Sequence, residues 1–161
     1  MKTFLVILWA VLANTALASE DNEAQMNRIS EELRTLVSTD PANGIPILVQ
    51  KLRNGTPIEK DAALYAIDRD NLVDQVPFVL DAITDMTPAP RYDDTGWTSI
   101  GRHAGWVVRN LILNNDRAWL SLSEQNGKAD SMDFLNSPER LQVKRLLETW
   151  WNDFHTRKLH P

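Results

Sequence analysis

Residues 54–67, which read Asn-Gly-Thr-Pro-Ile-Glu-Lys-Asp-Ala-Ala-Leu-Tyr-Ala-Ile, contain the strongest helix-start signal in the chain. The Asn-Gly pair ends a helix, because glycine readily adopts the backbone that closes a helix C-terminus. The Thr56 hydroxyl can accept a hydrogen bond from the amide of Glu59, and the amide of Thr56 can donate one to the Glu59 carboxylate in return, while Pro57 suits the first helical position. The alanines that follow allow a neighbouring helix to approach closely. The stretch predicts two successive helices joined by a tight turn.

Apolar residues recur at helical spacing along most of the remaining chain. We expect helices over about residues 21–37, 46–53, 57–67, 74–83, 99–113 and 138–155. Residues 40–44 read as a turn, because proline and an Asn-Gly pair interrupt helices there. Period-two alternation, the mark of a half-buried strand, is not found. The fold class predicted is all-α, either a short helical-repeat solenoid or an irregular bundle of about six helices.

The first 18 residues have the pattern of an export signal. Lys2 precedes an uninterrupted apolar run over residues 4–13, and Ala16-Leu17-Ala18 supplies the small-x-small motif of a signal peptidase site. The run is about half of the ~20 residues that a membrane-spanning helix needs, although a retained anchor is the alternative. We expect cleavage after Ala18 and a periplasmic or secreted protein with no stable membrane span in the mature chain.

Composition narrows the function classes further. The 161 residues contain 17 basic and 22 acidic side chains, for a formal net charge of −5, and no cysteine. A chain of this length predicts a single domain over residues 19–161. The lack of cysteine excludes disulfides, thiolate catalysis and Cys-ligated metals, and it favours a bacterial periplasm over a eukaryotic extracellular space. The acidic charge argues against a nucleic-acid partner, whose phosphates need a basic face.

Two segments of the chain echo each other. Ile45-Pro46-Ile47-Leu48 aligns with Val76-Pro77-Phe78-Val79 at an offset of 31 residues. Further along, Ala63, Ala66 and Ile67 align with Ala104, Val107 and Val108 at an offset of 41. A helix pair that occurs twice explains both offsets if about ten residues are inserted in the loop of the second copy. Such pairs stack, because one pair alone cannot bury its apolar face.

The Ile-Pro-x-Leu and Val-Pro-x-Val helix starts resemble the second helix of a HEAT repeat, and the alanine-rich helices resemble the first helix of the next repeat. The resemblance covers about residues 40–113, with the helix over about 138–155 as a C-terminal cap. It implies a scaffold that binds a partner. In size, compartment and helical class the chain is also similar to periplasmic toxin-immunity proteins, although no motif carries that likeness.

Known catalytic and cofactor motifs are not found in the sequence. It contains neither a dinucleotide fingerprint nor a phosphate-binding loop, and the serines lie in no G-x-S-x-G elbow. His103 has no carboxylate four residues away that would form a helical metal pair, and we expect it at the surface. We therefore assign no catalytic residue, no cofactor and no metal ligand.

The inserted loop over residues 88–97 is the best candidate for a functional surface. Its candidate partner-binding residues are Arg91, Tyr92, Asp93, Asp94 and Trp97. Tyrosine, tryptophan and arginine are enriched at binding hot spots, because they bury a large area at a small cost in entropy. The alternative is that Trp97 packs over the helix ends and that Asp94 or Thr98 only caps the following helix.

These observations predict a non-enzymatic, exported protein-binding module, such as an inhibitor or immunity protein that sequesters a periplasmic partner or toxin. An acidic chain favours a protein partner with a basic site, for example a toxin or a cell-wall enzyme. The alternative is a small periplasmic hydrolase or metal-dependent enzyme whose site combines scattered Asp, Glu and His. Self-association into a homo-oligomer is a third reading.

Overall fold

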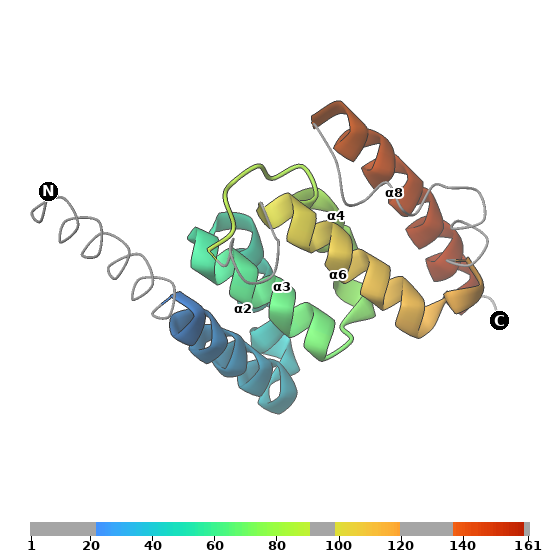
Figure 1. The fold of residues 1–161 in the computed structure, drawn as a ribbon. Coiled ribbons are helices and arrows are strands. Elements are labelled where there is room, and N and C mark those ends of the chain that lie inside the picture. The colour runs from blue at the N-terminus through green and yellow to red at the C-terminus, as the bar shows by residue number, and fades with distance from the viewer. Residues whose placement is uncertain (1–21, 91–98, 120–136, 160–161) are drawn as a thin grey trace, which may run out of the picture.

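The computed structural model describes residues 22–90, 99–119 and 137–159, and every regular element in these ranges is helical (Figure 1). The helices are 22–39, α2 (Pro41–Asn54), α3 (Pro57–Arg69), the 3₁₀ turn η1 (Val73–Gln75), α4 (Val76–Ala82), α6 (Ile100–Asn115), the short turn 117–119 and α8 (Ser137–Leu159). The all-α prediction is confirmed. The predicted signal segment lies outside the described residues. Within the described ranges, no helix combines the length and apolarity needed to cross a bilayer.

Helices α3 and α6 lie side by side and run in the same direction (Figure 1). Asp61 bonds to His103, and Asp68 accepts a hydrogen bond from Asn110, so that both contacts join residues 42 positions apart. A constant separation over two turns requires parallel helices with a fixed register.

The remaining helices cover this parallel pair. Helix α2 packs against α3 and α4, while α4 packs against α6 and α8. The arrangement places the α2–α3 turn and the α4–α6 connection at the same edge, where α3 and α6 begin (Figure 1). The α3–α4 turn and the end of α6 lie at the opposite edge.

The core is continuous through these helices. Ala62, Ala63 and Ala66 are fully buried, as the small-residue face of α3 predicts. At the C-terminal side, Trp150 is fully buried and lies 5.4 Å from Phe154 and 6.0 Å from Trp119 between ring centroids. Aromatic pairs at these separations stabilise a core beyond their buried area, which fixes α8 on the bundle.

Two helix starts are capped by side chains: the cap of α3 is the one that the sequence predicts, whereas the cap of α6 is Ser99 and not the predicted Asp94 or Thr98. At α3, the amide of Thr56 donates to Glu59 at 2.8 Å, and the amide of Glu59 donates to the Thr56 hydroxyl at 3.4 Å. This is a complete capping box. At α6, the hydroxyl of Ser99 accepts a hydrogen bond from the amide of Arg102 at 3.3 Å. Both caps satisfy amides that a helix leaves without an internal partner.

The predicted turn over residues 40–44 is wrong, because α2 begins at Pro41. Asp40 caps the helix through the amide of Asn43, and Pro41 occupies a position where its missing N–H costs nothing. Gly44 is buried, and a Cβ there would lie 2.7 Å from backbone atoms of Val37. The glycine therefore permits a close helix contact rather than ending a helix.

Candidate functional site

The base of the inserted loop is bound to the first turn of α6. The amide of Ile100 donates to the carbonyl of Thr87 at 2.9 Å, and the amide of Gly101 donates to the carbonyl of Asp85 at 2.8 Å. These contacts supply acceptors for two amides that lack partners within the helix. The described start of the loop, residues 83–90, is thus anchored to the helix that follows it.

Gly101 is required for this close docking. A Cβ at this position would lie 2.2 Å from the carbonyl oxygen of Ile83 and 2.7 Å from that of Asp85. Both neighbours are backbone atoms, which cannot move aside as a flexible side chain can. The requirement for glycine arises from the close approach of two chain segments.

Asp85 connects the loop base to α3. Its carboxylate accepts a hydrogen bond from Lys60 at 2.6 Å and from the amide of Thr87 at 2.9 Å. Burial alone would raise the pKa of Asp85, but the hydrogen bonds from Lys60 and Thr87 outweigh it and hold the pKa below its usual 3.8. The ionised carboxylate is therefore the form that the folded chain favours.

Arg140 connects α8 to the same loop base. It is only 6% exposed, and its guanidinium donates to the carbonyl of Asp85 at 3.5 Å. Burial lowers the pKa of Arg140 and the nearby charge of Arg102 lowers it further, while Asp85 opposes them. Groups from α3, α6 and α8 thus converge on one residue of the loop base.

A buried pair, Asp61 and His103, lies between α3 and α6 at the same edge. The Asp61 carboxylate oxygen Oδ1 is 2.5 Å from His103 Nδ1, and the two residues are 0% and 5% exposed. The prediction that His103 lies at the surface is wrong. A buried carboxylate needs a partner to offset its lost hydration, and His103 provides one from a helix 42 residues further along the chain.

An aspartate that holds a histidine is also the base–orienter arrangement of many hydrolases. In this chain both side chains are buried, and their contact joins α3 to α6. Among the described residues, no group of three or more His, Asp or Glu side chains is placed to hold a metal ion.

The predicted binding residues, Arg91, Tyr92, Asp93, Asp94 and Trp97, lie outside the described residues. The residues on either side of this segment are described. Ala89 is 4% exposed and Ser99 is 3% exposed, so the chain is buried just before and just after the segment. The structure thus places the residues on either side of the candidate loop, at the edge where α3 and α6 begin.

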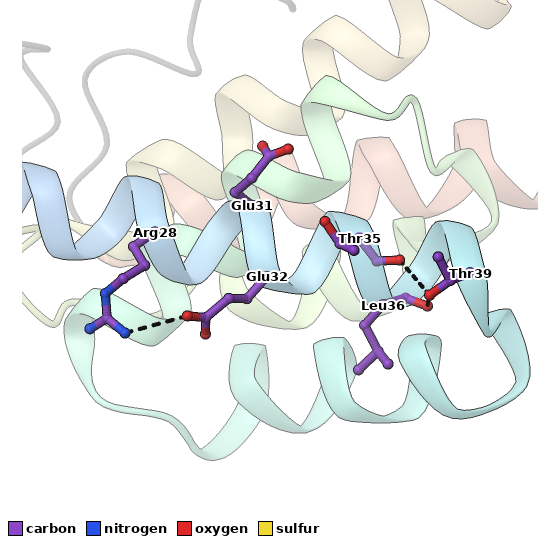
Figure 2. A pocket seen from close by; sticks show the side chains of 6 residues that line it. All are labelled: Arg28, Glu31, Glu32, Thr35, Leu36 and Thr39. Carbon is purple, nitrogen blue, oxygen red and sulfur yellow. Dashed lines mark hydrogen bonds and ion pairs between the residues drawn. The ribbon is translucent and has the colours of Figure 1, made fainter.

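A second surface lies along one side of helix 22–39. A hollow of about 610 Å³ there is lined by Arg28, Glu31, Glu32, Thr35, Leu36 and Thr39, whose side chains are drawn in Figure 2. Arg28 pairs with Glu32 at 3.3 Å, and the Thr39 hydroxyl donates to the carbonyl of Thr35 at 2.8 Å. All lining residues come from a single helix. The hollow brings no groups together from different parts of the fold.

No protein-family model matches the chain, and the comparisons with curated proteins and with solved structures likewise give no match.

Sequence reasoning missed the contacts that organise this edge. Asp61 follows a capping box in an otherwise ordinary helix start, and His103 lies one turn after the Ser99 cap. A usable signal was present in the spacing, because Asp61 and Asp68 are seven residues apart, as are His103 and Asn110. Polar residues that repeat at two-turn intervals on two helices are typical of a polar seam between them.

Proposed function

We propose that the protein is an exported protein-binding module that sequesters a partner, in the manner of an inhibitor or immunity protein. The observation that carries the proposal is the anchoring of the loop base, where Asp85 receives Lys60 from α3, the amide of Gly101 from α6 and Arg140 from α8. Loops that are held on a rigid scaffold are the usual carriers of recognition. The parallel α3–α6 pair supplies that scaffold.

The residues that we propose for contact are Arg91, Tyr92, Asp93, Asp94 and Trp97. Their types support the proposal, because aromatic and guanidinium groups dominate binding hot spots. The net charge of −5 favours encounter with a basic surface, such as that of a cationic toxin or cell-wall enzyme. The export signal in residues 1–18 would bring the module to the periplasm.

Affinity capture from the periplasm of the native cells tests this function. The wild-type chain should retain one stoichiometric partner, and the double variant Tyr92→Ala/Trp97→Ala should retain at least tenfold less. Ile47→Ala serves as the matched control, because Ile47 is an apolar side chain, 37% exposed, on α2. Equal retention by the loop variant and the wild-type chain would contradict the proposal.

The buried Asp61–His103 pair favours a second candidate, a hydrolase in which His103 acts as a base oriented by Asp61. This reading predicts turnover of an ester or amide substrate that His103→Gln abolishes while partner binding persists. The binding proposal predicts instead that His103→Gln changes the stability of the protein and that the wild-type chain has no turnover to lose.

A further inference from the structure

A separate pocket of about 250 Å³ opens where the ends of α2 and α4 meet the start of α3. Its lining combines apolar and charged side chains, chiefly Leu52, Phe78, Arg53, Lys60, Asp81 and Asp85. Lys60 and Asp85 form an ion pair, with 2.6 Å between Lys60 Nζ and Asp85 Oδ2, and this pair supports the loop base. The groups that the loop base does not use are Arg53, Phe78 and Asp81.

Arg53 is held in place with most of its hydrogen-bonding capacity unused. Its guanidinium carbon lies 4.7 Å from the centroid of the Phe78 ring, a cation–π contact that orients the group. It donates to Asp81 at 3.4 Å, near the long limit for a hydrogen bond. Its other N–H groups make no hydrogen bond to any described residue, and 51% of the side chain is exposed.

The charges around the pocket favour an anion of single charge. Lys144 from α8 lies 3.2 Å from Asp81, so that this carboxylate is shared between two cations. Lys144 is also 3.8 Å from Glu148, too far for a hydrogen bond. The lining itself is balanced, with Arg53 and Lys60 against Asp81 and Asp85, and Lys144 adds a third cation at the rim. A divalent phosphate would be repelled by both aspartates, whereas a carboxylate carries half that charge.

We propose that this pocket binds a peptide carboxylate of the partner. Arg53 offers the planar fork of donors that matches a carboxylate in a bidentate way, since a guanidinium has five N–H donors in a fixed geometry. Leu52 and Phe78 cover the apolar part of the residue that bears the carboxylate. The volume fits one residue, so the ligand is either the C-terminal carboxylate of a peptide or an acidic side chain.

The pocket proposal names the chemical group of the partner that is bound, a carboxylate. It rests on the proposed function in one respect, namely that the ligand belongs to a protein. Lys60 and Asp85 belong both to the pocket wall and to the loop base, so that the pocket adjoins the described start of the loop. Binding of a model peptide can be measured without the partner. An experiment that contradicts carboxylate binding in the pocket can therefore be told apart from one that contradicts partner binding by the loop.

Titration of the ¹⁵N-labelled chain, followed by its amide NMR signals, tests the proposal. One pair of probes is the peptide acetyl-Ala-Leu as the free acid and as the C-terminal amide, and the other is acetyl-Glu-amide and acetyl-Gln-amide. The test variant is Arg53→Gln. Arg28→Gln is its control, because Arg28 is also an exposed, ion-paired arginine but lies on helix 22–39.

We expect at least one acid probe to give saturable shifts around Leu52 and Phe78, and its neutral counterpart to bind at least tenfold more weakly. Arg53→Gln should weaken the acid at least fivefold, while Arg28→Gln stays within twofold of wild type. Which acid binds identifies the source of the carboxylate. Equal binding of acid and neutral probes, tighter binding of inorganic phosphate, or no effect of Arg53→Gln would overturn the proposal.

Discussion

Asp61 and His103 are 42 residues apart in the chain, yet their side chains lie 2.5 Å apart in the interior between α3 and α6. The same separation of 42 residues recurs two turns later, where Asn110 donates to Asp68 at 3.2 Å. These two contacts set the register of the parallel helices. Because both helices begin at the edge that bears the inserted loop, the register also determines the position of that loop.

The Asp61–His103 pair should contribute a measurable coupling energy. We expect Asp61→Ala and His103→Ala each to lower the free energy of unfolding by about 3 kcal/mol, because each leaves one buried polar group without its partner. The double variant should cost at least ~1 kcal/mol less than the sum of the two. Urea unfolding of the four proteins gives these values.

The exposed pair Arg28 and Glu32 provides the matched control for this cycle, since both side chains are about two-thirds exposed. Its coupling energy should be below about 0.5 kcal/mol. Additive effects of Asp61→Ala and His103→Ala would show that the buried pair does not set the register.

Gly101→Ala should destabilise the protein, although glycine-to-alanine changes within helices usually stabilise them. The added Cβ would lie 2.2 Å from the carbonyl oxygen of Ile83, so the loop base must shift. We expect a loss of about 1–3 kcal/mol in urea unfolding. Asn114→Ala, at an exposed position of the same helix, should change stability by less than about 0.5 kcal/mol. A Gly101→Ala variant as stable as wild type would refute the close docking.

Asp85 should make stability depend on acid pH. Its pKa in the folded chain lies below the usual 3.8, because the hydrogen bonds from Lys60 and Thr87 outweigh burial. A depressed folded pKa gives a stabilising contribution that is complete above the unfolded pKa and is lost as the pH falls through the folded pKa. The stability difference between wild type and Asp85→Asn should therefore be largest above about pH 4 and shrink below it.

Urea unfolding across a pH series checks this expectation. In a Lys60→Met background the pH-dependent part of the difference should become smaller, because the ammonium that lowers the pKa of Asp85 is gone. An Asp85→Asn difference that is constant from pH 2 to pH 7 would contradict the role of the ionised carboxylate.

The proposed export signal in residues 1–18 predicts that the protein reaches the periplasm in a processed form. Intact-mass analysis of the chain recovered from that compartment should give a protein that begins at Ser19. Ala18→Asp should block processing, because the signal peptidase site needs a small residue there. Recovery of the unprocessed chain from membranes in both cases would favour a retained anchor.

Local chemistry was enough to predict most helices but not the contacts between them. Thr56 was recognisable as a cap, because its partner lies within three residues, whereas Ser99 was missed in favour of Asp94 or Thr98. The start of α2 was missed, because the Asn43-Gly44 pair resembles a turn until Val37 is known to lie against it. The burial of His103 was missed, because it depends on a carboxylate 42 residues away and only the seven-residue spacing of polar residues on the two helices pointed to it.

The sequence could predict which residue types make up the candidate site, but not the contacts that hold it. The aromatic and charged residues of 91–97 stand out as a recognition segment by type alone. Its anchoring through Lys60, Asp85 and Gly101 depends on three elements that meet only in the folded chain. Tertiary contacts of this kind leave little trace in local periodicity.

Site-specific photo-crosslinking tests the central claim most directly. A benzophenone amino acid replaces Tyr92 in one protein and Asn114, at the opposite edge of the helices, in another. After illumination in intact cells, the account predicts a covalent adduct with a single partner from position 92 and none from position 114. An adduct from position 114, with none from position 92, would contradict the assignment of the binding surface to the loop edge.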